Sequence, residues 1–238
     1  MTNLPTPSAP GQDKPPLALR LVALCITLAT PILLVMFSVR LVMTPLFLQL
    51  VYNRPGFPAD FYGFTTQERL RYAPRALEYL LNAEDISYLG NMRFADGQSM
   101  YNARELHHMQ DVKWVTQVAF IVVLVLAILI TVMIVALIRK KQTRPLLRRA
   151  LLHGSLLTLA AIFAIVIVAI FNWNVFFNAF HQFFFESGTW RFQYSDTLIR
   201  LFPEQFWFEA VLAIGCLTFV AAGLVYLLAG RRKSEYDI

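Results

Sequence analysis

Four long apolar stretches divide the chain, and polar segments separate them. They cover residues 21–39, 114–138, 151–171 and 210–230, and none contains an Asp, Glu, Lys or Arg residue. As a helix, an apolar run of about 18 residues or more can cross the hydrocarbon core of a bilayer. Composition agrees, because 57% of the residues are hydrophobic and only 15% are charged, compared with roughly 25% charged in soluble domains. The pattern therefore predicts a membrane protein with four transmembrane helices.

The polar segment between the first two apolar stretches is long enough to have structure of its own. Thr65 and Glu68 form a capping-box signature at the start of an amphipathic helix. Residues 86–102 contain aromatic residues interrupted by glycine, which predicts a short hairpin. A helix resumes at about Ala103 and leads into the second apolar stretch. We therefore expect an all-α membrane bundle of four transmembrane helices with a small α+β extracytoplasmic cap.

Basic residues indicate how the helices cross the membrane. The segment between the second and third apolar stretches, residues 139–150, contains six Lys and Arg residues and no acid. Short basic loops stay in the cytoplasm, so both termini are expected there. The net charge of +6 then reflects topology and not a nucleic-acid-binding surface. The predicted segments are, in order, a disordered cytoplasmic tail (1–16), the first transmembrane helix with an outer extension (17–52), the extracytoplasmic cap (53–113), the second helix (114–138), a basic cytoplasmic loop (139–150), the third helix (151–171), an aromatic extracytoplasmic segment (172–209), the fourth helix (210–230) and a cytoplasmic tail (231–238).

The aromatic segment is unusual in its composition. Between Phe171 and Phe208, fifteen of thirty-eight residues are aromatic, and eleven of these are phenylalanine. Aromatic belts at membrane surfaces favour Trp and Tyr instead. The segment therefore favours an apolar chamber or lipid-facing pocket, although plain interfacial packing is the alternative. Its only histidine, His181, lies in the middle of the rings.

The four histidines differ in their expected depth. His153 lies at the basic, cytoplasmic end of the third apolar stretch, where an interfacial position is typical. His107, His108 and His181 all fall at the outer boundary of the membrane. Two histidines from separate segments at one depth are a candidate acid/base pair. No serine or cysteine of the outer segments has a recognisable nucleophile context, so the nucleophile would come from the substrate.

Acidic residues flank the histidine doublet. Glu105, His108 and Asp111 are spaced three residues apart and share one stripe of a helix. A carboxylate at this spacing can hold one ring nitrogen as an N–H donor and leave the other free as a base. The alternative is that the acids pair with Arg104 or Lys113. His107 points about 100° away from His108 around the helix and cannot share its role.

Two motifs resemble a known family, the lipoprotein intramolecular transacylases. The resemblance covers roughly Val22 to Leu228 in layout. The first motif runs into the second apolar stretch, and the second contains the remaining outer histidine. Their residues are Glu105, His108, Met109, Asp111, Val112 and Lys113 in the first, and Phe180, His181, Phe184, Phe185, Trp190, Asp196, Leu198, Ile199, Phe202 and Pro203 in the second.

The resemblance implies a bacterial enzyme of the cytoplasmic membrane with its active site at the outer face. Such an enzyme moves the sn-2 acyl chain of a diacylglyceryl-cysteine lipoprotein to the cysteine's own α-amino group and leaves a lyso-form lipoprotein. The motif assigns catalysis to His108 and His181, with no cofactor and no metal. Expected partners are the diacylated lipoprotein and membrane lipids. The supporting residues are expected to be Glu105, Asp111, Lys113, Trp190 and Asp196, and the substrate-binding residues Phe177, Phe184, Phe185, Arg191 and Arg40.

Three other functions remain open on the residues alone. A non-enzymatic membrane subunit or receptor with an aromatic outer pocket would explain the spans and the rings. An outer metal site would use His108, His181 and an acid, but the sequence lacks the dense His and Cys spacing typical of such sites. A transporter is disfavoured, because no charged residue lies in the middle of a span.

Overall fold

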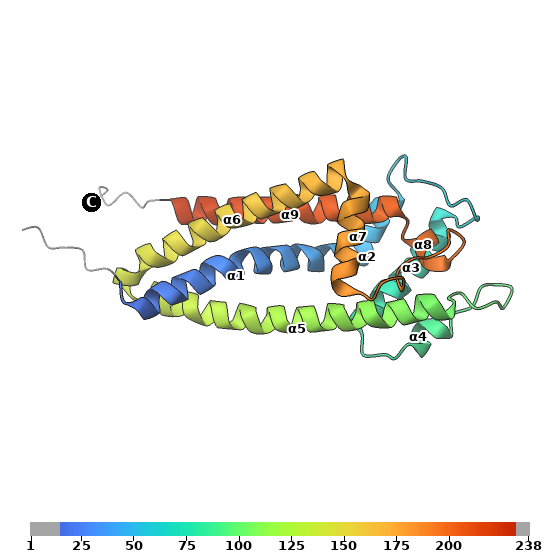
Figure 1. Ribbon diagram of the computed structural model, residues 1–238, viewed down its shortest axis with the longest axis horizontal. Coiled ribbons are helices and arrows are strands. Elements are labelled where there is room, and N and C mark those ends of the chain that lie inside the picture. The colour runs from blue at the N-terminus through green and yellow to red at the C-terminus, as the bar shows by residue number, and fades with distance from the viewer. Residues whose placement is uncertain (1–14, 232–238) are drawn as a thin grey trace, which may run out of the picture.

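The computed structural model of the protein describes residues 15–231, in which four long helices form a bundle. Each contains an apolar stretch long enough to cross a membrane, so the four predicted spans are confirmed. Figure 1 shows the helices running along the long axis, with the start of α1 and the end of α9 at the same end and the smaller helices at the other. The four helices are α1 (Leu17–Val42), α5 (Ala103–Arg139), α6 (Arg144–Phe171) and α9 (Glu204–Gly230).

Helices α1, α6 and α9 pack closely against one another. A Cβ atom added to Gly154 of α6 would lie 2.7 Å from Thr30 of α1, and one added to Gly215 of α9 would lie 2.6 Å from Val166 of α6. Small residues permit such close approach of helices in a membrane, where packing and hydrogen bonds replace the hydrophobic effect. Thr218 of α9 also donates a buried hydrogen bond of 3.0 Å to Ser38 of α1.

Helix α5 is buried less than the other three. It packs mainly on α1 and α3 and more weakly on α6, and half of its large apolar side chains are exposed. Its first turns, from Ala103 to Lys113, continue beyond the apolar stretch that begins at Trp114. Lipid is the natural partner for an apolar helix face at this depth. The same helix therefore carries both a membrane span and part of the cap.

The connection between α5 and α6 differs from the predicted loop 139–150. A 3₁₀ helix covers Lys141–Thr143, and α6 then begins at Arg144. Pro145 lies in the first turn of α6, where a missing N–H costs no hydrogen bond. The basic residues after this point therefore lie on a helix, so the predicted loop was too long.

The cap is built from short helices. Thr65 and Glu68 make the predicted capping box, with Thr65 N donating to Glu68 Oε2 at 2.8 Å and Glu68 N donating to Thr65 Oγ1 at 3.2 Å. The buried core beneath these helices includes Tyr79, Leu89 and Leu201. The helices of the cap are α2 (Pro45–Tyr52), α3 (Thr66–Leu81), α4 (Ser87–Gly90) and α8 (Thr197–Leu201).

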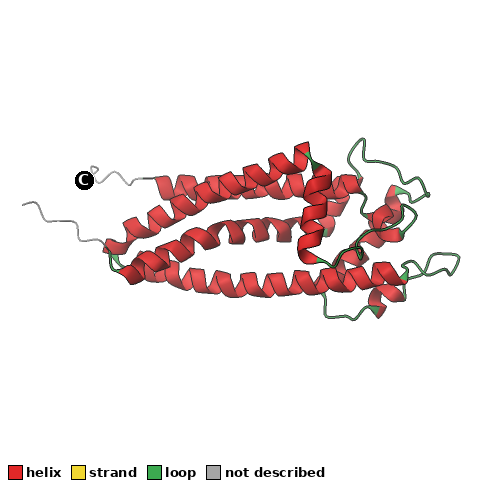
Figure 2. Cartoon of the chain, viewed as in Figure 1, coloured by secondary structure: helices red, strands yellow, loops and turns green. Residues whose placement is uncertain are grey.

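The α+β character predicted for the cap was wrong. Figure 2 shows helices and loops only, and residues 15–231 contain no strand. The predicted hairpin is a turn with one isolated bridge between Arg93 and Ser99, and Gly97 adopts a φ of +84° at its tip. So short a pairing cannot stabilise a sheet by itself, and residues 87–90 form a helical turn before it. The cap is helical throughout its regular elements.

A last helix, α7 (Trp173–Phe184), lies across the cap end of the bundle. It follows α6 after one residue, and Asn172 caps it by accepting a hydrogen bond of 3.3 Å from Val175 N. None of its residues is buried. In Figure 1 it bridges from α6 toward α5, which brings the aromatic segment to the helix that carries the histidine doublet.

Candidate active site

Helices α5 and α7 bring His108 and His181 face to face. Their ring centroids are 6.4 Å apart and the ring planes differ by 24°. His108 lies in the second turn of α5, whose start is fixed by a capping box between Asn102 and Glu105. His181 lies near the end of α7. The structure therefore assembles the two histidines that the sequence placed at one depth, and they are called the histidine pair below.

His181 is held in one tautomer. Its Nδ1 lies 2.8 Å from the backbone oxygen of Phe177. A carbonyl oxygen can only accept, so Nδ1 carries the proton and Nε2 keeps its lone pair. The rings of Phe177 and Trp190 lie against the imidazole, with centroids at 4.0 and 4.8 Å. His181 is thus a fixed imidazole with one nitrogen available as a base.

His108 is buried, with 8% of its surface exposed, and its Nδ1 has no hydrogen-bond partner. The rings of Phe185 and Phe192 meet its ring edge-on at 5.0 and 5.4 Å. Burial, reinforced by His181, lowers the pKa of His108 to about 4, and burial also lowers the pKa of His181. Both residues precede or follow the apolar stretches that cross the membrane. At neutral pH the site therefore holds two neutral imidazoles.

The predicted hydrogen bond between Glu105 and His108 is not formed. Glu105 Oε2 accepts from Asn102 N at 2.8 Å, and Oε1 accepts from Leu198 N at 2.7 Å, at the start of α8. The N–H groups at the starts of two helices have no partners within their helices, and they donate to the oxygens of this carboxylate instead. Glu105 is 1% exposed, and burial raises its pKa. It positions α5 against α8 and does not orient the histidine.

The other charged residues of the two motifs have partners other than the histidine pair. Asp111 faces His107, with 3.7 Å between Oδ2 and Nε2. Asp196 accepts from Arg104 at 3.0 Å and, like Glu105, ties the loop before α8 to the start of α5. Lys113 Nζ lies 4.0 Å from the ring centre of Tyr79 and donates to Asn82 Oδ1 at 3.1 Å on the cap. Neither Glu105 nor Asp111 orients His108, and neither of these two acids pairs with Arg104 or Lys113.

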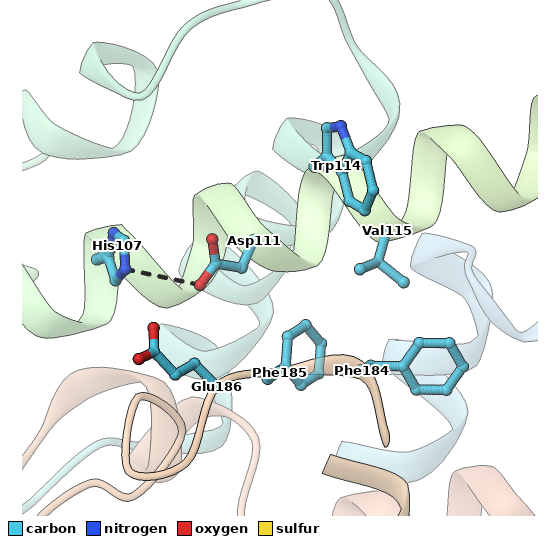
Figure 3. A pocket seen from close by; sticks show the side chains of 7 residues that line it. All are labelled: His107, Asp111, Trp114, Val115, Phe184, Phe185 and Glu186. Atoms are coloured by element: carbon cyan, nitrogen blue, oxygen red, sulfur yellow. Dashed lines mark ion pairs between the residues drawn. The ribbon is translucent and has the colours of Figure 1, made fainter. Parts of the chain in front are cut away.

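A pocket of about 340 Å³ lies beside the histidine pair, between α5 and the end of α7. Figure 3 shows its lining, with Glu186 directed toward His107 and Asp111. Glu186 follows the phenylalanines of the second motif, and its position in the sequence does not identify it as a site residue. We call this cavity the side pocket. It is lined by His107, Asp111, Trp114, Val115, Phe184, Phe185 and Glu186.

Trp190 supplies a second buried polar atom at the site. It is 7% exposed, and its indole Nε1 has no hydrogen-bond partner. The Arg191 guanidinium lies 5.2 Å from the centre of its ring. Buried indole N–H groups normally find an acceptor, so an unpaired one next to His181 is available to a substrate oxygen.

A family model described as lipoprotein intramolecular transacylase Lit matches residues 24–207. The match spans most of the chain and contains both histidines of the pair. The chain belongs to this transacylase family. Its general activity is therefore acyl transfer on lipoproteins, and it is a multi-pass membrane protein. Membership favours the predicted transacylase over the receptor, the metal-dependent enzyme and the transporter.

Solved structures agree with the fold of this transacylase. The membrane-integral lipoprotein intramolecular transacylase of Bacillus cereus is 22% identical, with a TM-score of 0.68 over 89% of this chain and 94% of that chain. A variant of that protein with a histidine replaced by arginine gives a TM-score of 0.66 at 22% identity, over 90% and 91% of the two chains. An uncharacterized protein from Aquifex aeolicus (strain VF5) is 28% identical, over 89% of this chain and 94% of that protein.

The transacylase brings some of its predicted site residues together and leaves others apart. Phe177 and Phe185 contact the histidine pair, and Phe184 lines the side pocket. Arg40 instead donates to Met43 O at 3.2 Å, at the end of α1. None of the hydrogen bonds or ring contacts found in residues 15–231 joins Arg40, Lys113 or Asp196 to either histidine.

Proposed function

We propose that this chain moves the sn-2 acyl chain of a diacylglyceryl-cysteine lipoprotein to the lipoprotein's own N-terminal α-amino group. The product is a lyso-form lipoprotein with an N-acyl chain. The single observation that carries the proposal is the histidine pair, two neutral imidazoles stacked at the boundary between cap and membrane. Neutral imidazoles match the reaction, in which a proton leaves an amine and returns to an alcohol.

His181 is the base in this proposal. The α-amine nitrogen attacks the carbonyl carbon of the sn-2 ester, and His181 Nε2 takes the proton that the nitrogen loses. The bond from Nδ1 to Phe177 O presents Nε2 and stabilises the imidazolium that forms. The carbon–oxygen bond of the ester then breaks, and the proton passes to the departing glyceryl oxygen. Bonds and protons balance without a further reactant.

Two N–H donors are available for the oxygen atoms of the reaction. The ester carbonyl oxygen becomes negative when the amine adds, and preorganised donors stabilise such an oxyanion. Trp190 Nε1 is buried and unpaired, and the rings of both Trp190 and His108 lie near His181, with centroids at 4.8 and 6.4 Å. We assign the oxyanion to Trp190 and the departing glyceryl oxygen to a neutral N–H of His108.

The aromatic residues position the substrate. Amine and ester belong to one molecule, so the enzyme mainly has to hold them in a compact geometry. Phe177, Phe184 and Phe185 surround the histidine pair and form the surface for the acyl chains, and exposed Arg191 can reach peptide or glyceryl oxygens. We place the pair at the outer face of the bacterial cytoplasmic membrane and both termini in the cytoplasm. The short connection 139–150, which has six Lys and Arg residues and no acid, lies at the opposite end of the bundle.

The test is direct. The chain is expressed with a diacylated reporter lipoprotein in a bacterium that lacks the N-acylating enzyme, and the reporter's N-terminal lipopeptide is analysed by mass spectrometry. We expect an N-acyl lyso form with the wild type and with His153→Ala, which changes an exposed histidine at the opposite end of α6. His108→Ala and His181→Ala should leave the reporter diacylated. An unmodified reporter with folded, inserted wild type would overturn the proposal.

A further inference from the structure

We propose that the side pocket is an ammonium site, which binds the protonated α-amino group of the lipoprotein substrate before acyl transfer and so selects lipoproteins with a free N-terminus. The inference rests on the proposed function, since it takes the diacylated lipoprotein as the substrate. It concerns a surface separate from the catalytic imidazoles: neither His108 nor His181 lines the pocket.

One end of the side pocket is negatively charged. Asp111 and Glu186 contribute two carboxylates, and Figure 3 shows Glu186 directed toward Asp111 and His107. Asp111 has only His107 as an ion-pair partner, at 3.7 Å, and within residues 15–231 Glu186 takes part in no ion pair. Nearby cations are used elsewhere. Arg104 is paired with Asp196, and Lys113 is held on the cap.

The other end of the side pocket is apolar. Trp114 and Val115 begin the membrane-spanning stretch of α5, and Phe184 and Phe185 face them from the end of α7. A ligand that fits both ends has a cation joined to a lipid chain. The α-ammonium is the one cation that every diacylated lipoprotein carries next to its acyl chains. It is largely protonated at neutral pH, because free α-amino groups have a pKa of about 7.7–8.0.

Phe185 forms a common wall between the side pocket and the histidine pair. Its ring lines the pocket and meets the ring of His108 at 5.0 Å and that of His181 at 5.8 Å. Behind this wall His108 is buried, with Nδ1 unpaired. An ammonium in the pocket is therefore one side chain away from the base. It gives up one proton to water before the neutral nitrogen attacks, so His181 still receives only the proton lost during attack. The N-acyl product is a neutral amide, which the carboxylates do not hold, so the same site favours release of product.

Binding without turnover tests the pocket. The probe is a synthetic diacylglyceryl-cysteine peptide with a free N-terminus, compared with its N-acetylated analogue, and the full chain carries His181→Ala so that no acyl transfer occurs. We expect the free amine to bind at least about tenfold more tightly than the N-acetyl probe. Adding Asp111→Asn and Glu186→Gln should abolish this preference and leave binding of the N-acetyl probe unchanged. Glu84→Gln, which neutralises an exposed acid on the cap, is the matched control.

Several outcomes would overturn the inference. These are equal affinity for the two probes, a preference that survives in the Asp111→Asn and Glu186→Gln variant, or a charge-dependent affinity for phosphatidylethanolamine vesicles that matches that for the free lipopeptide. The results separate the two proposals. The Asp111→Asn and Glu186→Gln variant that keeps His181 should N-acylate less well than wild type. Normal N-acylation by this variant would contradict the ammonium site but not the proposed acyl transfer. A selective pocket in a chain that never N-acylates would contradict the transfer chemistry alone.

Discussion

Buried polar groups have hydrogen-bond partners in the packed half of the bundle, formed by α1, α6 and α9. Where α5 meets the cap, some buried polar groups have none. In α1, α6 and α9, each buried hydroxyl has a partner: for example, Thr30 donates to Ile26 O and Thr158 to Gly154 O, both at 2.7 Å. At the cap end, His108 Nδ1 and Trp190 Nε1 are buried and unpaired, and residues 15–231 contain one more such atom, Tyr101 Oη. An unsatisfied buried polar group costs about 1–3 kcal/mol. The protein thus carries a cost to stability at the site where we place the reaction.

This difference indicates that one region stabilises the fold and the other is built for substrate. The bundle half uses glycine contacts and satisfied hydroxyls, which stabilise the fold and leave nothing available to a ligand. The site has one imidazole held in a fixed orientation, two unpaired ring nitrogens and a charged pocket. These groups do little for the fold, and we propose that they act on the substrate. Substitutions at the site should therefore lower activity and leave stability unchanged. Substitutions in the packed half should lower stability and leave the rate per folded molecule unchanged.

The largest effect is expected for His108→Phe. The ring keeps its contacts with Phe185 and Phe192 but loses both nitrogens. Removal of one preorganised hydrogen-bond donor costs about 10²–10³-fold in turnover, so N-acylation should fall by that range. The thermal midpoint in detergent should not fall, because an unpaired polar atom is removed. A variant that loses stability in parallel with activity would show that His108 supports the fold instead.

The second effect concerns Trp190→Phe. Loss of one oxyanion donor lowers turnover on the order of 10²-fold. We expect kcat to fall and KM to change little, because the donor acts on charge that develops only during the reaction. Trp207→Phe, at an indole that is 43% exposed, is the control. A rise in KM at unchanged kcat would assign Trp190 to substrate binding.

These first two predictions rest on residues that the sequence identified to different degrees. Shared depth predicted that His108 and His181 would meet, because span boundaries fix height in a membrane. The partner of Glu105 was missed, although Asn102 three residues before it gives the same capping signature that was recognised at Thr65 and Glu68. Capping takes precedence over the neighbouring imidazole, since the helix start has unpaired N–H groups wherever the tertiary structure places it.

Other features could not be predicted because they depend on contacts between distant segments. Glu186 joins Asp111 only because α7 lies across the bundle, and a lone acid after a run of phenylalanines gives no signal of that. The unpaired nitrogen of Trp190 likewise depends on how the loop after α7 is buried. The predicted hairpin of the cap was wrong for the same kind of reason, since its aromatic residues pack on α3 and α5 and form no sheet.

A smaller effect is expected in the packed half, from Gly154→Ala. The added Cβ would lie 2.7 Å from Thr30, so α1 and α6 must separate. Overpacking of this kind costs about 1–3 kcal/mol, which should lower the thermal midpoint while the rate per folded molecule stays unchanged. Gly223→Ala on α9 is the matched control, because its Cβ would meet nothing within 4 Å. Equal midpoints for the two variants would remove the argument for close packing.

The smallest effect is the contribution of His108 to the dependence of stability on pH. The pKa of His108 is about 4 in the folded chain, below the value of about 6.5 for an unperturbed histidine. Between these values the unfolded chain binds more protons than the folded one, so stability falls as pH falls from 6.5 toward 4. Wild type should therefore lose more stability over this window than His108→Phe, in matched denaturant titrations. Gly154→Ala introduces no titratable group, so its free energy of unfolding should lie below that of wild type by the same amount at each pH. Parallel curves for wild type and His108→Phe would mean that the buried imidazole is not held neutral by the fold, and would remove the physical basis for treating it as a neutral donor.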